Sequence, residues 1–286
     1  MTNEMRERTV LVTGASAGIG RATAAALAGM GAQVLMASRS EERGEAAVRS
    51  VLDAVPGARV RLLLADISTP EGVRALAEET LEASDRLDVL VNNAGVFTRT
   101  RESTKDGFEL QFAVNHLAPF FLTSLLRGRL EASAPSRIVT VSSEAHRRGR
   151  INFDDLQGER GYSGLGAYTQ SKLANLLFTR ELARRLSGTG VTANAVHPGV
   201  VATRLLFDGF GPLRLLAPFL KTPEQGARTT VHVASAPALE RITGLYFIDG
   251  KSARPSTRAL DDDTARRLWE ISTRMTGIDT WEKRAT

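Results

Sequence analysis

The sequence contains no cysteine among its 286 residues, so it can form no disulfide, thiolate metal site or thiol nucleophile. The redox compartment therefore stays undetermined. The four histidines, His116, His146, His197 and His232, are scattered without the spacing of metal ligands, and we expect no metal site. The first twenty residues contain no apolar run of the length that a signal peptide or a membrane span requires. We therefore expect a soluble, cytoplasmic protein with no membrane anchor.

The sequence also predicts no continuous surface of a single charge sign. The chain carries 37 Lys and Arg against 32 Asp and Glu, and its formal net charge is +5. The two signs are interleaved along the predicted helices and form no basic stripe with aromatic residues, so we expect a solvated surface and no nucleic-acid partner. Hydrophobic residues make up 42% of the chain and charged residues 24%, as in soluble globular proteins. The length suits one large α/β domain over residues 1–286.

What the sequence does contain is an alternation of short apolar runs with helix-period segments. Strand-like runs lie at 9–13, 33–37, 60–65, 87–91, 138–141, 191–196 and 244–248. Helical patterns lie at 18–30 and 41–54, and a further helix opens at 68–71. This alternation predicts a doubly wound, mostly parallel seven-stranded sheet with helices on both faces, of the Rossmann type. Ligand sites are expected at the carboxyl ends of its strands.

A glycine-rich turn follows the first predicted strand and opens the first helix. Gly14, Gly18 and Gly20 lie in this turn. Glycine lets the backbone turn tightly and approach a pyrophosphate, while the helix that follows offers free N–H groups and a positive dipole end. The strand and helix on either side make a nucleotide site credible.

The end of the second strand predicts the choice of cofactor. An acidic side chain there would bind the ribose hydroxyls of NAD, but this chain has Ser38 and Arg39. A hydroxyl and a guanidinium favour the 2′-phosphate, so we expect NADP(H) over NAD(H). The alternative is that Arg39 only begins the charged face of the next helix, together with Glu41, Glu42 and Arg43.

Tyr168 and Lys172 form the pair with the most chemical meaning. Residues four apart on a helix share a face, so the ammonium can lie beside the phenol and favour its ionised form. Such a pair occurs by chance in many chains, where the Tyr is half-buried and the Lys is exposed. Its position about 150 residues after the glycine turn predicts nicotinamide chemistry.

These features together resemble the short-chain dehydrogenase/reductase family. The glycine spacing resembles its TGxxxGxG motif, residues 92–95 resemble its NNAG turn, and residues 197–203 resemble the segment after its sixth strand. The resemblance implies a catalytic set of Asn115, Ser143, Tyr168 and Lys172. It implies cofactor contacts at Gly14, Ser16, Gly18, Ile19, Gly20, Ser38, Arg39, Asp66, Ile67, Asn93, Ala94, Gly95, Tyr168, Lys172, Pro198, Gly199, Val201 and Thr203. Many NADP-using members carry a basic residue where this chain has Ala17.

The resemblance implies a reaction in which carbonyl and alcohol interconvert. Tyr168 donates a proton to the developing alkoxide, Ser143 stabilises that oxygen, and Asn115 anchors a water relay through Lys172. Residue type alone leaves open whether Ser142 or Ser143 has this role. For the reverse reaction we expect Lys172, with the oxidised nicotinamide, to lower the pKa of Tyr168 from its usual value near 10. The alternative function is a non-catalytic NADP-binding regulatory or scaffold protein on the same fold.

The segments that differ most from the common family pattern predict the substrate. Ser143 and Tyr168 are 25 residues apart, and residues 151–168, 171–178 and 268–270 resemble the retinol dehydrogenase-like branch. Residues 200–222 are apolar with glycine and proline breaks, which suits a lid over a lipophilic aldehyde, ketone or alcohol; an oligomer contact or core packing is the alternative. His146 and the arginines beside it are predicted to lie in a solvated loop. The family likeness also implies a homodimer or homotetramer that pairs helices near residues 105–130 and 165–187.

Overall fold

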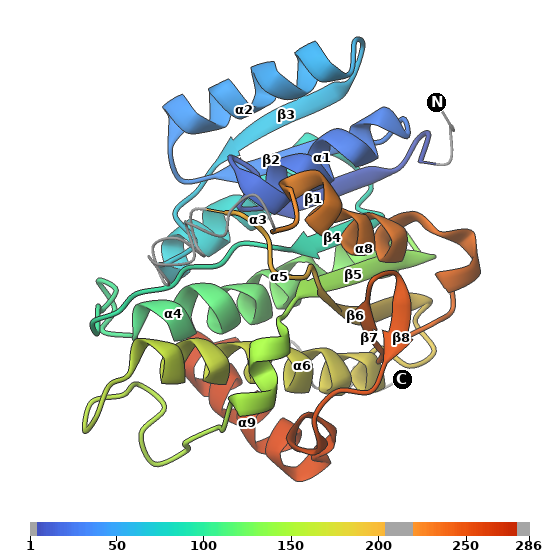
Figure 1. Ribbon diagram of the computed structural model, residues 1–286. Helices are drawn as coiled ribbons and strands as arrows, with labels where there is room; N and C mark the ends of the chain where they lie inside the picture. Colours follow the sequence, from blue (N-terminus) through green and yellow to red (C-terminus); the bar gives the residue numbers. More distant parts are fainter. Residues whose placement is uncertain (1–4, 204–219, 279–286) are drawn as a thin grey trace.

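The fold is an eight-stranded sheet in a computed structural model that describes residues 5–203 and 220–278 (Figure 1). The spatial order is β3-β2-β1-β4-β5-β6-β7-β8, and every pairing is parallel except that of β7 with β8. The strands are β1 (Thr9–Thr13), β2 (Gln33–Ser38), β3 (Arg59–Leu64), β4 (Val89–Asn92), β5 (Ser136–Val141), β6 (Val191–His197), β7 (Tyr246–Ile248) and β8 (Lys251–Ala253).

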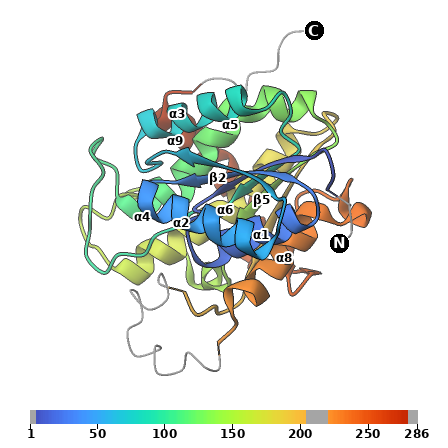
Figure 2. The same cartoon turned by 90° about the horizontal axis from the view of Figure 1, so that it is seen from above.

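Helices cover both faces of this sheet. They are α1 (Gly18–Gly29), α2 (Glu41–Ala54), α3 (Pro70–Ala83), α4 (Leu110–Phe112), α5 (Ala118–Ala132), α6 (Gly164–Arg185), α8 (Pro223–Ser235) and α9 (Asp262–Thr276). A π-helical turn, η1 (Ala113–Leu117), joins α4 to α5, and short 3₁₀ turns lie at η2 (Glu144–Arg148), η4 (Pro237–Leu239) and η5 (Thr257–Leu260). In Figure 2, α3, α5 and α9 lie on one side of the sheet and α1, α2 and α8 on the other.

The sheet is buried on both faces because alternate strand residues supply two separate cores. In β1, Leu11 packs with the core under α3, α5 and α6, whereas Val10 and Val12 pack with the core under α1, α2 and α8. All three side chains are fully buried. In a parallel sheet covered on both faces, the strands are apolar along their whole length. The sequence therefore showed them as short apolar runs.

The predicted doubly wound, mostly parallel, single-domain architecture is confirmed, but the predicted count of seven strands is wrong. After β7, Asp249 and Gly250 take positive φ angles of 48° and 74°, and the chain returns as β8 antiparallel to β7. Two such residues form the tight hairpin turn that matches the twist of the strands. The three residues of β8 are largely polar and exposed, so no apolar pattern marked them as a strand.

The carboxyl-terminal helix α9 covers part of α6. Trp269 stacks on Phe178 at 5.9 Å between ring centroids and meets Phe120 edge-on at 4.9 Å. The guanidinium of Arg185 lies over the outer face of the indole at 4.4 Å from its centroid. The helices predicted to pair in an oligomer are α5 and α6, so the chain itself covers part of that surface. Homo-oligomerisation stays a prediction.

Most of the predicted lid, residues 204–219, lies outside the described residues. Its two ends are described and lie together, because Val201 pairs with Lys221 in a parallel bridge. The amide of Ala202 donates to the Lys221 carbonyl at 3.0 Å, and the amide of Lys221 donates to the Val200 carbonyl at 3.1 Å. Within residues 5–203 and 220–278, every helix is too short or too polar to cross a lipid bilayer.

Candidate active site

The glycine turn after β1 is shaped by contacts that only glycine permits. Gly14 has φ +65°, and a Cβ there would lie 2.9 Å from Cα of Ala94. A Cβ on Gly20 would lie 2.3 Å from the carbonyl oxygen of Gly14 and 2.5 Å from Nδ2 of Asn93. The turn therefore packs directly on the turn that follows β4.

Thr13 joins these two turns, and sequence reasoning had not singled it out. Its hydroxyl accepts hydrogen bonds from the amides of Asn93 and Ala94, both at 3.0 Å. The side-chain amide of Asn93 donates to the carbonyl of Thr13 at 2.8 Å. Thr203 closes the cradle from the other side, with its methyl 3.2 Å from the place of a Cβ on Gly18. The threonine before Gly14 was the available signal, because it ends a strand that pairs with β4.

The first turn of α1 has the free donors that a pyrophosphate needs. The helices α2, α3, α6, α8 and α9 each begin with a side-chain cap, and α5 continues directly from η1, whereas the N-cap of α1, Ala17, makes no side-chain hydrogen bond. Unpaired N–H groups and the positive end of the helix dipole lie at this place. Ser16 and Ile19 are half-buried beside them. The cradle therefore fits a dinucleotide at its predicted site.

The predicted cofactor residues at the ends of β2 and β3 lie side by side, since Ser38 pairs in register with Leu64. The hydroxyl of Ser38 donates to the carbonyl of Ser40 at 2.9 Å and accepts from its amide at 3.2 Å, so it shapes the turn. Arg39 is exposed beside it. Asp66 is exposed and accepts from the amide of Ser68 at 3.0 Å, which leaves one carboxylate oxygen open to the edge of the sheet.

Ser143, Tyr168 and Lys172 meet at the carboxyl end of β5. Ser143 acts on the pKa of the Tyr168 hydroxyl, so its side chain lies at the phenol, which favours Ser143 over Ser142. Ser142 instead donates to the carbonyl of Lys172 at 2.7 Å and so secures α6 to the strand end. The ammonium of Lys172 lies 5.6 Å from the centre of the Tyr168 ring and donates to the carbonyl of Val141 at 3.1 Å. The predicted shared face of the tyrosine and lysine is confirmed.

The expected effect of Lys172 and the oxidised nicotinamide on the pKa of Tyr168 stays a prediction for the complex, since burial dominates both groups in the protein alone. Burial raises the pKa of Tyr168 to about 12, opposed only by the hydrogen bond from Ser143. Burial also lowers the pKa of Lys172 to about 8. The ammonium points at the strand-end carbonyl and is itself poorly solvated, so desolvation outweighs its attraction for the phenolate. In this structure the tyrosine is a protonated acid at neutral pH.

Asn115 lies in the π-helical turn between α4 and α5. Its side-chain oxygen accepts from the amide of Val96 at 2.8 Å. Its side-chain nitrogen donates to the carbonyl of Val96 at 3.1 Å and to the hydroxyl of Ser171 at 3.0 Å. The asparagine therefore joins the loop after β4 to the helix of Tyr168. The extra residue in the π-turn directs it there.

The histidines differ from expectation at one position. His146 was predicted to lie in a solvated loop, and this is wrong, because its ring is fully buried behind Ser143. His197 packs at the end of β6, where its Nδ1 accepts from the amide of Glu144 at 3.4 Å. Within residues 5–203 and 220–278, no group of three or more His, Asp or Glu side chains is arranged to hold a metal ion.

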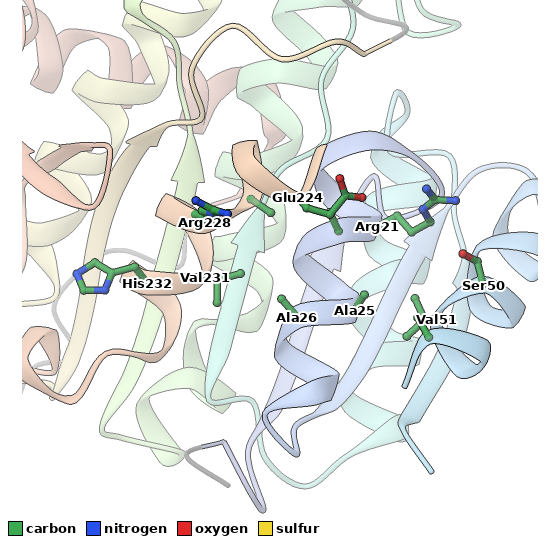
Figure 3. Close-up of a pocket in the computed structure, with 12 residues that line it drawn as sticks. Arg21, Ala25, Ala26, Ser50, Val51, Glu224, Arg228, Val231 and His232 are labelled. Atoms are coloured by element: carbon green, nitrogen blue, oxygen red, sulfur yellow. The ribbon is translucent and has the colours of Figure 1, made fainter. Parts of the chain in front are cut away.

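A groove of about 520 Å³ lies elsewhere, on the outer face of α1 between α2 and α8 (Figure 3). Arg21, Glu224, Arg228 and His232 border a floor of small apolar side chains. It contains none of the predicted site residues, because the predicted catalytic side chains lie at the carboxyl edge of the sheet instead. We therefore take that edge as the candidate active site.

The model of the short chain dehydrogenase family matches residues 8–208. The chain belongs to this family. It is similar to human retinol dehydrogenase 14, with 47% identity over 96% of this chain and 88% of the relative. Human retinol dehydrogenase 12 shows the same identity over the same shares of the two chains. The retinol dehydrogenase-like branch is thereby confirmed.

Solved structures agree with this assignment. A crystal structure of an uncharacterised protein from Mycobacterium paratuberculosis has a TM-score of 0.80 and 38% identity, and covers 96% of this chain and 95% of its own. A short chain dehydrogenase from Shigella flexneri in complex with NADP has a TM-score of 0.72 and 26% identity, and covers 88% and 100%. Members of this family bind a nicotinamide cofactor and act on small molecules. The chain is an oxidoreductase of carbonyl and alcohol groups.

Proposed function

We propose that this short chain dehydrogenase uses NADP(H) to interconvert a lipophilic carbonyl compound and its alcohol, with Tyr168 as the general acid and base. Bound NADPH supplies the hydride. The hydroxyl of Tyr168 gives its proton to the substrate oxygen, and that of Ser143 stabilises the charge developing there. Lys172 and Asn115 fix α6 and the loop after β4 around these two hydroxyls.

The nearness of the Tyr168 and Ser143 side chains carries this proposal, because Ser143 acts on the pKa of the phenol. At the carboxyl end of β5 a substrate carbonyl oxygen could accept from both hydroxyls. A pKa of about 12 keeps Tyr168 protonated near neutrality, so the resting protein is ready to donate a proton.

The preference for NADPH is proposed from Arg39. Its guanidinium is exposed at the end of β2, whereas the hydroxyl of Ser38 is used within the turn. Arg39 would therefore bind the 2′-phosphate by charge-assisted hydrogen bonds. Arg39→Asp should raise the KM for NADPH by about 10-fold or more, the effect of roughly 1.4 kcal/mol, and leave that for NADH nearly unchanged. Equal loss for both cofactors would point to a general role in α2.

The lipophilic substrate is proposed from the side chains around the catalytic pair. The ring of Phe97 lies 5.7 Å from that of Tyr168. Leu165, one helical turn before Tyr168, is 39% exposed, and Val200, just after the Pro198 and Gly199 pair, is 52% exposed. The names of the retinol dehydrogenase relatives make retinoids one option within this class. Phe97 had not been identified from the sequence.

One assay tests cofactor and substrate together. NADPH and NADH oxidation are followed with a retinal-like polyenal, a long-chain aldehyde, a cyclic ketone and a small sugar, on wild type and on Tyr168→Phe. We expect NADPH-dependent reduction of the first three, abolished by the substitution. Activity on the sugar alone would contradict the lipophilic class. NADPH binding without turnover of any carbonyl would favour the alternative, a non-catalytic NADP-binding protein.

A further inference from the structure

The loop that follows Ser143 is fastened to the carboxyl-terminal part of the chain through a buried imidazole. Ser143 caps the 3₁₀ turn η2, and its hydroxyl accepts from the amide of Ala145 at 3.2 Å. The carbonyl of Ser143 lies 2.7 Å from Nδ1 of His146 and accepts from the amide of His146 at 3.0 Å. The other ring nitrogen, Nε2, lies 3.0 Å from the amide nitrogen of Ser256. One side chain therefore joins two segments 110 residues apart.

These contacts define the protonation of the ring. A backbone amide can only donate, so Nε2 facing Ser256 must be the unprotonated acceptor. The proton of a neutral imidazole then resides on Nδ1, where it donates to the carbonyl of Ser143. Burial lowers the pKa of His146 from its ordinary value of 6.5, which agrees with a neutral ring.

Neighbouring contacts reinforce the same connection. The ring of Tyr246 in β7 meets His146 edge-on at 5.2 Å, and its hydroxyl donates to the carboxylate of Glu144 at 3.1 Å. Arg147 donates to the carbonyl of Arg254 at 2.9 Å. From the carboxyl-terminal segment, Arg258 in turn donates to the carbonyl of Gly149 at 3.1 Å. Residues 143–149 and 254–258 are thus joined by three hydrogen bonds across one buried ring.

We propose that His146 is a positioning residue for Ser143: its Nδ1 proton fixes the serine carbonyl, and its Nε2 anchors the ring to Ser256, so that the serine side chain stays next to Tyr168. This role rests on the proposed reductase function. In this proposal the segment after β8 contributes to catalysis indirectly, because its Ser256 amide anchors the His146 ring.

The role predicts a pH dependence of turnover. Protonation of Nε2 would place two donors against each other at Ser256, so the anchor is lost as the pH falls through the His146 pKa, below 6.5. kcat should be constant above that pH and fall below it. The titratable and charged groups that face the ring from the surrounding elements are Glu144, Arg147, His197, Tyr246 and Arg258. All five stay in place in a His146 variant, so their own titration is common to both proteins.

Three substitutions separate the two hydrogen bonds. His146→Asn keeps a donor for the Ser143 carbonyl, His146→Gln keeps an acceptor for the Ser256 amide, and His146→Phe keeps only the ring volume. We expect His146→Phe and His146→Gln to lower kcat by about 5- to 10-fold, the effect of one net hydrogen bond, with the KM for NADPH within about twofold of wild type. His146→Asn has no acceptor for the Ser256 amide, so at every pH it should show the reduced kcat that wild type reaches below its acid limb, and its profile should lack that limb. His232→Gln, exposed on α8, is the control.

The outcomes distinguish the two proposals. Wild type inactive on every carbonyl tested refutes the proposed function itself. Active wild type with unchanged kcat in folded His146→Phe and His146→Gln, judged by circular dichroism and melting temperature, overturns the positioning role. An acid limb that persists in His146→Asn also overturns it. If His146→Phe does not fold, His146→Gln and the pH profile of His146→Asn give the decision.

Discussion

At the scale of single residues, burial shifts the pKa values of Tyr168 and Lys172 in opposite directions. Loss of water keeps Tyr168 protonated and makes the positive charge of Lys172 costly, because each charged form is the poorly solvated one. A protonated phenol suits proton donation. The reverse reaction needs the phenolate form, which burial disfavours.

Removing the tyrosine hydroxyl should remove the acid. Tyr168→Phe should lower kcat for carbonyl reduction by about 10²–10⁴-fold and leave the KM for NADPH nearly unchanged, because general acid catalysis is lost without loss of binding surface. Steady-state assays measure both. The matched control is Tyr162→Phe, whose hydroxyl contacts Glu109 at 3.0 Å and Gln111 at 2.8 Å instead of Ser143. Near wild-type turnover by Tyr168→Phe would refute the assignment.

We expect Lys172 to lower the free energy of unfolding at neutral pH. Its pKa is lowered from 10.5 to about 8, so the unfolded chain binds this proton more tightly. Between pH 8 and pH 10.5 the free energy of unfolding therefore rises with pH. Below about pH 8 the full cost of burying the charged ammonium is present. Lys172→Met should therefore stabilise the protein at pH 7 by about 1–3 kcal/mol, at about 1.4 kcal/mol per pKa unit, while abolishing activity.

Urea unfolding at pH 7 and pH 10 measures this effect, and the gain should shrink at the higher pH. The carbonyl of Val141 keeps a partner in the variant, since Asn175 also donates to it at 3.3 Å. A variant less stable than wild type at pH 7 would show that the hydrogen bond from Lys172 outweighs the desolvation of its charge.

At the scale of elements, the cradle depends on the close approach of α1 to the turn after β4. Gly20→Ala should raise the dissociation constant of NADPH by about 10-fold or more, because its Cβ would lie 2.3 Å from the Gly14 carbonyl and displace the turn. Fluorescence titration with NADPH measures the change.

Gly128 in α5 provides the matched helical control. A Cβ there meets nothing within 4 Å, so Gly128→Ala should bind NADPH normally and gain about 0.5–1 kcal/mol in the free energy of unfolding. Unchanged cofactor affinity in Gly20→Ala would mean that the cradle does not bind the cofactor.

At the scale of the whole molecule, α9 completes the core above α5 and α6. Trp269 is 4% exposed and contacts Phe120, Phe178 and Arg185. Trp269→Ala should lower the free energy of unfolding by about 3–5 kcal/mol through the cavity it leaves. Arg266→Ala, at an exposed position of the same helix, should have little effect on unfolding by urea. An equal effect of the two substitutions would show that α9 is not packed as described.

The same helix bears on assembly. A homodimer or homotetramer that uses the part of α5 and α6 covered by α9 would have to include α9 in its interface or displace it. Sedimentation of wild type and Trp269→Ala distinguishes these cases, since only an interface built on α9 should weaken with the substitution.

The sequence alone predicted the strands of the buried sheet closely, because residues such as Val10, Leu11 and Val12 must all be apolar when both faces are covered. It also predicted the glycine turn and the common face of Tyr168 and Lys172, since both follow from local backbone geometry. It missed β8, whose three residues carry no apolar pattern, and it placed His146 in solvent because a histidine among arginines resembles a surface loop.

The amino-acid sequence by itself determined the layered α/β architecture, the glycine turn after β1 and the common face of Tyr168 and Lys172, because periodicity, glycine spacing and helical spacing act over short stretches of chain. Only the tertiary structure decided the direction of the pKa shifts and the anchoring of Ser143 through His146. The pKa shifts depend on burial in the folded core, and the anchoring of His146 depends on β7 and the segment after β8, which lie about 100 residues further along the chain.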